Sequence, residues 1–305
     1  MSEYILPNFK QLFKKRLGQS IGDIFDFIKK IFAFLSVSSL FIGGTGFFKT
    51  FIGYALLGIH PSIQVCFAVF LVSFSVYTLD KIADLDKDTT NMPERLKFLK
   101  GRKNLAFTYS LAAYLLSMLL IFLDRPLSSL IVLVPMAANA IYGTRLIPGI
   151  PRLKDIPVMK NLVVATSWAL VTTLLPAMHL SDPALWTVVM VVYFMLIKTF
   201  IDTVLYDIRD VKGDQENGVR TIPVILGTQK TVKILLALNG TLLLGLPFIE
   251  GSIRLLTLTL VAYGYAYILY FKERRDPLAL DFCVEGEWML ASIFLIMILG
   301  KVGLA

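Results

Sequence analysis

The chain has 305 residues, of which 56% are hydrophobic and 17% are charged, and its mean hydropathy is +0.71. Soluble domains average about 25% charged residues, so this composition excludes an ordinary soluble protein. The net charge of +8 is compatible with a nucleic-acid partner. However, the basic residues are distributed as expected for membrane topology, so no nucleic-acid partner is predicted.

The first 31 residues are basic and amphipathic. Their apolar side chains follow helical spacing among lysines, at Leu6, Phe9, Leu12, Phe13 and Leu17. This pattern is typical of a helix that lies in a membrane interface. There is no early apolar core or small-residue cleavage site, so a cleavable signal peptide is not expected. Residues 1–31 are predicted to be a cytoplasmic segment and residues 32–305 a membrane domain.

Runs of about 20 mostly apolar residues recur along the membrane domain, each long enough to cross ~30 Å of hydrocarbon. They predict nine transmembrane helices, at Phe32–Leu57, Ile63–Asp80, Asn104–Leu123, Leu127–Tyr142, Asn161–Met178, Pro183–Asp207, Thr231–Ile249, Ile253–Phe271 and Trp288–Val302. The predicted fold class is therefore all-α, a polytopic bundle of nine transmembrane helices. Between the spans, nearly all lysines and arginines fall on one side, and only Arg125, Arg254 and Lys301 fall on the other. This bias places the basic side in the cytoplasm and indicates a multi-pass plasma-membrane protein.

Three local features of the spans have simple interpretations. The first span contains Gly43-Gly44-Thr45-Gly46, which indicates either a kink or, as we favour, a close packing contact. Cys66 and Cys283 are far apart and are interpreted as small buried residues, with no disulfide framework. His60 and His179 have no partner at ligand spacing and are assigned to the far interface.

An acidic row follows the second span. It reads Asp80-Lys81-Ile82-Ala83-Asp84-Leu85-Asp86-Lys87-Asp88, so a continued helix would place Asp80, Asp84 and Asp88 on one face. Like charges in such a row repel one another. A divalent cation at the membrane surface would explain why they are kept together.

A second acidic row ends the sixth span. Lys198, Asp202, Tyr206, Asp210 and Asp214 recur every four residues. Lys198 and Asp202 lie within the apolar stretch, where ionisable groups usually face a cavity. The alternative to a cavity is that Lys198 and Asp202 form an ion pair within the helix and neutralise each other. The glycines that follow Asp210 are expected to end the helix.

Other polar positions are less specific. The connection from Gly143 to Asn161 is rich in proline, glycine and basic residues. Its basic residues either bind phosphate oxygens or only reflect the excess of positive charge on the cytoplasmic side. Glu285 and Glu287 suit a helix N-terminus and are given no catalytic role. The two acidic rows occupy equivalent places in helices 1–4 and 5–8, which predicts two related four-helix units plus one helix, with the site between the units.

Two opposing carboxylate rows form an all-oxygen site of the kind that Mg²⁺ prefers, together with water and substrate phosphates. Such a site can stabilise a leaving diphosphate, and an allylic C–O bond can then ionise to a carbocation. Apolar helices with aromatic side chains can shield that cation from water.

These motifs resemble those of the UbiA-type intramembrane prenyltransferases. The family's first motif, N-D-x-x-D-x-x-x-D, is matched by the row from Asp80 to Asp88, with Asp80 in place of the usual Asn and Lys81 in place of the first Asp. Its second motif, D-x-x-D-x-x-G-D, is matched by Asp207-Ile208-Arg209-Asp210-Val211-Lys212-Gly213-Asp214. The following G-x-R-T-[LI]-P-V-x-L-G is matched from Gly218 to Gly227. The usual R-P-[LI]-x-x-G after the first motif is absent.

The resemblance implies a Mg²⁺-dependent enzyme that transfers an isoprenyl group from a polyprenyl diphosphate to a lipophilic, often aromatic, acceptor. It implies a catalytic set of Asp84, Asp88, Asp210 and Asp214, with Asp80 added as a fifth metal ligand. The expected diphosphate-binding residues are Lys154, Tyr142, Arg145, Lys30 and Asp207. The expected substrate-cavity residues are Asn139, Lys198, Asp202 and Tyr206. The acceptor could be a hydroxybenzoate, a naphthoate, a glyceryl phosphate ether or a carotenoid-type molecule.

The alternative function is a cation or lipid transporter with acidic gating residues. It would also account for acidic helix ends and an internal repeat. It predicts carboxylates near the bilayer midplane, whereas most of these carboxylates cluster at one predicted face.

Overall fold

The computed structural model describes residues 27–28, 30–83, 99, 101–143, 156–182, 184–274 and 276–302. All regular elements in these ranges are helical, as the predicted all-α class requires. The α-helices are α2 (Leu40–Leu56), α3 (Ile63–Ala83), α6 (Lys103–Asp124), α7 (Ser129–Gly143), α8 (Met159–Ala177), α9 (Leu185–Glu216), α10 (Ile222–Leu226), α11 (Thr228–Thr241), α12 (Gly251–Phe271), α13 (Pro277–Leu280) and α14 (Glu287–Val302). The other helical elements are the 3₁₀ helices η1 (Pro126–Ser128) and η3 (Leu242–Phe248), the π-helical turn η4 (Asp281–Glu285) and the segment Lys30–Val37.

Five helices in the described part of the chain are long and apolar enough to cross a membrane. A sixth span is obtained if the bent pair of Lys30–Val37 and α2 is taken as one. Helices α7, α8 and α14 occupy the three remaining predicted ranges, but they do not combine the length and the hydropathy that the other spans have. The chain is thus a helical membrane protein, and the number of nine spans stays a prediction.

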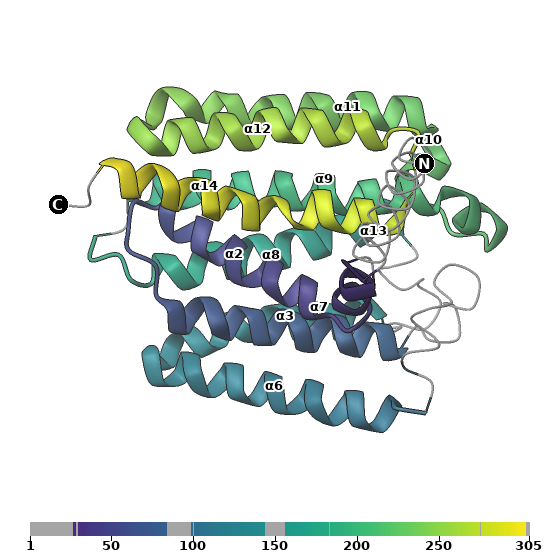
Figure 1. The fold of residues 1–305 in the computed structure, drawn as a ribbon, viewed down its shortest axis with the longest axis horizontal. Helices are drawn as coiled ribbons and strands as arrows, with labels where there is room; N and C mark the ends of the chain where they lie inside the picture. Colours follow the sequence, from purple (N-terminus) through teal and green to yellow (C-terminus); the bar gives the residue numbers. More distant parts are fainter. Residues whose placement is uncertain are drawn as a thin grey trace, which may run out of the picture.

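The helices lie side by side with their axes roughly aligned (Figure 1). From bottom to top in that view the order is α6, α3, α2, α14, α12 and α11, and each of these helices contacts the next. Helices α7, α8 and α9 pack in succession across the other side of this row. The chain therefore forms one bundle in which α2 and α8 lie centrally.

Two apolar clusters form the interior. One gathers side chains of α9, α11, α12 and α14, and the other gathers side chains of α3, α6 and α7. Helices α2 and α8 contribute to both: Ile52 and Ala169 belong to the first cluster, whereas Tyr54 and Trp168 belong to the second. These two helices therefore join the halves of the bundle.

The outer helix α6 shows how the bundle meets its surroundings. Most of its large apolar side chains are exposed, among them Leu115, Leu119 and Phe122. Its inner face is lined by small polar residues, and Ser110 and Ser117 donate hydrogen bonds of 2.8 Å to backbone carbonyls of α3. Small residues at the seam and apolar residues outside are typical of helices that pack within lipid.

The glycines of α2 serve close packing, as predicted, rather than a kink. A Cβ at Gly46 would lie 2.2 Å from Ser73 Oγ, and one at Gly53 would lie 2.1 Å from the carbonyl oxygen of Thr172. The helix axis does bend, by 75°, but it does so between Val37 and Leu40, before the glycines. Ser39 has a φ of +64° at this bend.

Gly53→Ala is expected to destabilise the protein by about 1–3 kcal/mol, because the new methyl group would meet the backbone of α8. The measurement is the apparent unfolding temperature of purified protein in detergent. Gly44→Ala is the matched control, since its methyl group would meet only the flexible end of Met289. Equal unfolding temperatures for the two variants would contradict this account.

Helix α9 is longer than its apolar run. The predicted span ended at Asp207, but the helix continues to Glu216 and carries the whole second acidic row. Gly213 lies inside the helix, contrary to the expectation that it helps to end it. Two residues after the end of the helix, Gly218 has a φ of +69°, and hydrogen bonds run from Gly218 N to Gln215 O and from Val219 N to Asp214 O. This is the Schellman pattern that only glycine adopts readily.

Candidate active site

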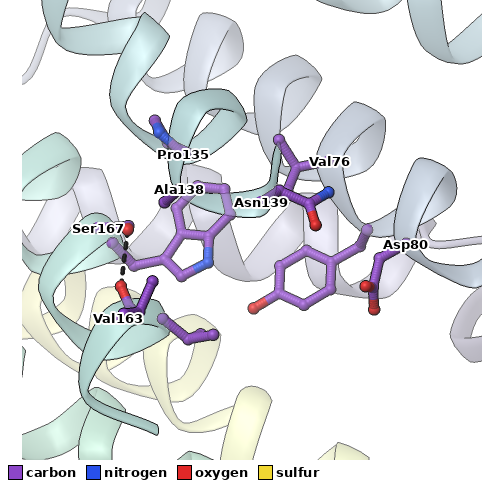
Figure 2. Close-up of a pocket in the computed structure, with 10 residues that line it drawn as sticks. Val76, Asp80, Pro135, Ala138, Asn139, Val163 and Ser167 are labelled. Carbon is purple, nitrogen blue, oxygen red and sulfur yellow. Dashed lines mark hydrogen bonds between the residues drawn. The ribbon is translucent and has the colours of Figure 1, made fainter. Parts of the chain in front are cut away.

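Helices α3, α7 and α8 enclose a pocket that is open on one side. Its enclosed volume is about 80 Å³, smaller than a typical small-molecule site, so in this structure it is a narrow cleft. It is lined by Val76, Tyr77 and Asp80 of α3, Pro135, Ala138 and Asn139 of α7, and Val163, Val164, Ser167 and Trp168 of α8. Asp80 lies at one edge of the pocket, and Ser167 and Val163 lie at the opposite edge (Figure 2). Such a pocket suits a ligand with a charged head and an apolar tail.

The inner wall of this pocket is apolar and aromatic. The rings of Tyr77 and Trp168 stack with centroids 5.6 Å apart and planes within 9° of parallel. The hydroxyl of Ser167 donates to Val163 O of its own helix at 2.7 Å (Figure 2), so its donor is already used. The two π-faces provide a surface that attracts a cation without supplying a nucleophile.

Asp207 is fixed at the start of the second acidic motif. Its carboxylate is 1% exposed and accepts hydrogen bonds from Lys160 Nζ at 2.7 Å and from Asn161 Nδ2 at 2.8 Å. Both partners come from the first turn of α8. The Lys160 side chain is 36% exposed. The pair therefore ties α8 to α9 while the lysine side chain remains partly exposed.

Asp210 and Asp214 follow on the same helix. Arg209 donates two parallel hydrogen bonds to the Asp210 carboxylate, at 2.8 and 2.7 Å. Asp214 Oδ2 is buried and accepts no hydrogen bond from the described residues. An orphaned carboxylate oxygen of this kind is unusual in a folded protein and leaves capacity for a ligand.

Several predicted site residues fall outside this description. Asp84, Asp88, Arg145 and Lys154 lie outside the described residues, and so does the side chain of Tyr142, which belongs to the last turn of α7. Lys30 is exposed on the first helical segment. Within the described ranges, no three carboxylate, histidine or cysteine side chains come close enough to hold a metal ion.

Lys198 and Asp202 do not line the pocket. They belong to a buried charged cluster between α2, α9, α12 and α14. Lys198 Nζ lies 2.6 Å from Glu287 Oε1 and 2.8 Å from the Tyr267 hydroxyl. Asp202 is paired with Lys49 at 3.8 Å. The intrahelical pair considered from the sequence is therefore replaced by pairs between helices.

Tyr206 lies beside this cluster, toward the end of α9. Its hydroxyl donates to Glu285 Oε1 at 3.5 Å, and Arg209 Cζ lies 4.9 Å from its ring centroid. Glu285 belongs to η4, outside the spans, and burial raises the pKa of its carboxyl, against the opposing field of Lys49.

Sequence reasoning missed the partners that hold these groups, namely Lys49, Asn161, Arg209 and Asp281, whose Oδ1 lies 4.0 Å from Arg209 Nη1. Lys49 had a usable signal, because an ionisable residue within an apolar run rarely lacks a role. Asp281 had none, since it lies in a short connection without a periodic pattern.

Known proteins share both the sequence and the fold of this chain. A digeranylgeranylglyceryl phosphate synthase from Methanosphaera stadtmanae is 28% identical over 173 residues, which is 56% of this chain and 60% of that protein. The chain thus matches less than two thirds of that relative's length. The corresponding protein of Methanococcoides burtonii is 24% identical over 220 residues, 71% of this chain and 75% of that protein.

Two solved structures have the same fold. A UbiA homolog from Archaeoglobus fulgidus, bound to GPP and Mg²⁺, gives a TM-score of 0.63 at 16% identity, over 87% of this chain and 99% of that one. The apo UbiA homolog from Aeropyrum pernix gives a TM-score of 0.60 at 16% identity, over 84% of this chain and 98% of that one. The model of the UbiA prenyltransferase family matches residues 31–283. Because this match covers most of the chain and includes both acidic motifs, the chain belongs to the UbiA prenyltransferase family.

Proposed function

We propose that this protein transfers an isoprenyl group from an isoprenyl diphosphate to a lipophilic acceptor within the membrane, with Mg²⁺. The observation that carries the proposal is the acidic end of α9, where Asp214 keeps a buried carboxylate oxygen without a hydrogen bond from the described residues. Asp80 supplies a second acidic position at the edge of the aromatic pocket. The positive-inside charge bias supports a site on the cytoplasmic side.

The donor set fits Mg²⁺. The proposed ligands Asp80, Asp84, Asp88, Asp210 and Asp214 are all carboxylates, the hard oxygen donors that this ion prefers. When bound, Mg²⁺ supplies Lewis-acid stabilisation of the diphosphate leaving group. Lys160 is added to the diphosphate-binding residues predicted from the sequence, because Asp207 orients its ammonium while its side chain remains 36% exposed.

The residues of this chain then have separate tasks. The allylic C–O bond breaks, its electron pair leaves with the diphosphate, and lysine and arginine side chains balance that charge. The remaining allylic carbocation is stabilised by the parts of the Tyr77 and Trp168 rings that line the pocket. The apolar wall keeps water away until the acceptor nucleophile forms the new bond and its proton passes to the released diphosphate.

Among the acceptors left open by the sequence, we place a prenylated glyceryl phosphate first. The support is the name shared by the relatives from Methanosphaera stadtmanae and Methanococcoides burtonii, digeranylgeranylglyceryl phosphate synthase. Hydroxybenzoate and naphthoate acceptors are the comparison class.

The test is an assay of purified protein in lipid nanodiscs with labelled geranyl or geranylgeranyl diphosphate. Each acceptor class is added with Mg²⁺ or with EDTA. We expect a prenylated lipid product that requires Mg²⁺. Absence of product from every donor and acceptor pair, together with Mg²⁺-independent ion flux in sealed vesicles, would favour the transporter instead.

Trp168→Ala is expected to change the preference for donor length. Removing the indole would deepen the apolar pocket, so the rate ratio of geranylgeranyl to geranyl diphosphate should rise roughly tenfold. Competition between the two labelled donors measures this ratio directly. Trp186→Ala is the control, because Trp186 is exposed on another part of the bundle. An unchanged ratio in Trp168→Ala would place the isoprenyl chain elsewhere.

A further inference from the structure

The bend between Lys30–Val37 and α2 leaves helix-end carbonyls that need donors. The first segment stops at Val37, and the chain turns by 75° through Ser39, whose φ is +64°. Lys81 of α3 fills this need: its Nζ lies 2.7 Å from Ser36 O and 3.2 Å from Val37 O. A cation at a helix C-terminus is favoured by both the free carbonyls and the helix dipole.

The same serine also reaches the opposite side of the bundle. Ser36 Oγ donates a hydrogen bond to Asp281 Oδ2 in the turn η4. The other carboxylate oxygen of Asp281 lies 4.0 Å from Arg209 Nη1, and Arg209 holds Asp210 through two hydrogen bonds. A continuous set of polar contacts therefore runs from Lys81 through Ser36, Asp281 and Arg209 to Asp210.

This set of contacts connects the two acidic motifs. Lys81 directly follows Asp80 in the first motif, and Arg209 directly precedes Asp210 in the second. Lys81 is 9% exposed, and the side chains of Arg209 and Asp281 are 13% and 17% exposed. The hydrogen bonds of Lys81 and of Asp281 with Ser36 are charge-assisted and little exposed to water, which places them among the stronger polar contacts in proteins, whereas Asp281 and Arg209 form an ion pair at 4.0 Å.

We propose that Lys81, Ser36, Asp281 and Arg209 form a clasp that positions the two acidic motifs relative to each other. The inference rests on the proposed function for the role of those motifs. In this clasp Lys81 is a positioning residue and not a ligand, which gives a physical reason for lysine at the place where the family motif usually has its first aspartate. The bend at Ser39 directs the Ser36 carbonyl to α3 and the Ser36 hydroxyl to η4.

The experiment uses the full-length protein and the variants Lys81→Met, Lys81→Arg, Ser36→Ala and Ser38→Ala. Lys81→Met keeps the length of the side chain without its charge, and Lys81→Arg restores a cation with several donors. Ser38→Ala is the matched control, because the Ser38 hydroxyl bonds only to Leu35 O in its own segment among the described contacts. Each variant is analysed by hydrogen–deuterium exchange without donor, and by steady-state kinetics with labelled isoprenyl diphosphate and Mg²⁺.

We expect Lys81→Met and Ser36→Ala to raise exchange both at residues 36–40 and at the C-terminal half of α9, about tenfold or more. The KM for the diphosphate should rise roughly tenfold, while kcat at saturation stays within about twofold, since the ligands themselves are intact. Lys81→Arg should recover most of the wild-type KM, and Ser38→Ala should resemble the wild type.

Exchange that changes only at the bend, with no effect on α9, would overturn the clasp even if activity fell. Unchanged KM in Lys81→Met and Ser36→Ala would do the same. If Lys81→Met does not fold, Ser36→Ala alone decides, because it removes one hydroxyl and no charge. If the wild type transfers no prenyl group, the proposed function fails, whereas the exchange result still tests the clasp.

Discussion

Replacing Asp214 by asparagine is expected to lower the rate of prenyl transfer by about 10²–10³-fold without unfolding the protein. The reason lies in the geometry of this carboxylate. Its Oδ2 is buried and accepts no hydrogen bond from the described residues, so the substitution removes a charge and a ligand oxygen, and the main described interaction that is lost is the attraction to the Lys160 ammonium. The measurements are kcat and KM at several Mg²⁺ concentrations, with the apparent unfolding temperature measured in parallel.

The comparison with other acidic positions makes this prediction specific. Asp84→Ala and Asp210→Ala are also expected to abolish transfer while the protein still folds. Asp207→Asn should affect both activity and stability, because the Asp207 carboxylate binds Lys160 and Asn161. Asp182→Asn, at an exposed position before α9, is the control and should behave as the wild type. Normal transfer rates in Asp214→Asn or Asp210→Ala would reject the proposed mechanism.

The sequence predicted the helical class and the acidic motifs because both depend on local pattern. An apolar run of 20 residues has few alternatives to a helix in lipid. The four-residue recurrence from Lys198 to Asp214 predicted a helical face that α9 does present, over a longer range than the apolar run alone indicated. The Gly43-Gly44-Thr45-Gly46 stretch of α2 was interpreted as a close packing contact, and the approach of Gly46 to Ser73 of α3 confirms this.

The sequence could not predict which charges meet across the bundle. Asp202, four residues away on the same helix, was considered as the ion-pair partner of Lys198. The Lys198 ammonium instead lies 2.6 Å from Glu287, which begins α14. Lys49 and Asp281 likewise acquire their partners only from the packing of distant helices. Hydropathy indicates that a segment is buried, but the rotation of each helix, which decides these pairs, depends on side-chain packing over the whole bundle. The bend at Ser39 was also missed, because no glycine or proline marks it.

The buried pair of Lys198 and Glu287 leads to the second large expected effect. Lys198→Met is expected to destabilise the protein by about 3–5 kcal/mol, since it leaves a buried carboxylate without its nearest cation. Lys198 is completely buried and Glu287 is 1% exposed, so water cannot readily replace the lost partner. The measurement is a shift in the apparent unfolding temperature in detergent, and Lys233→Met on the exposed face of α11 is the control.

The double variant Lys198→Met/Glu287→Leu tests whether the loss comes from an uncompensated charge or from packing. If the charge is responsible, removing Glu287 as well should recover much of the stability, because two apolar side chains of similar volume need no counterion. If packing is responsible, the two losses should add. A Lys198→Met variant as stable as the wild type would show that Lys49 can neutralise both carboxylates, and the pair would then be dispensable for folding.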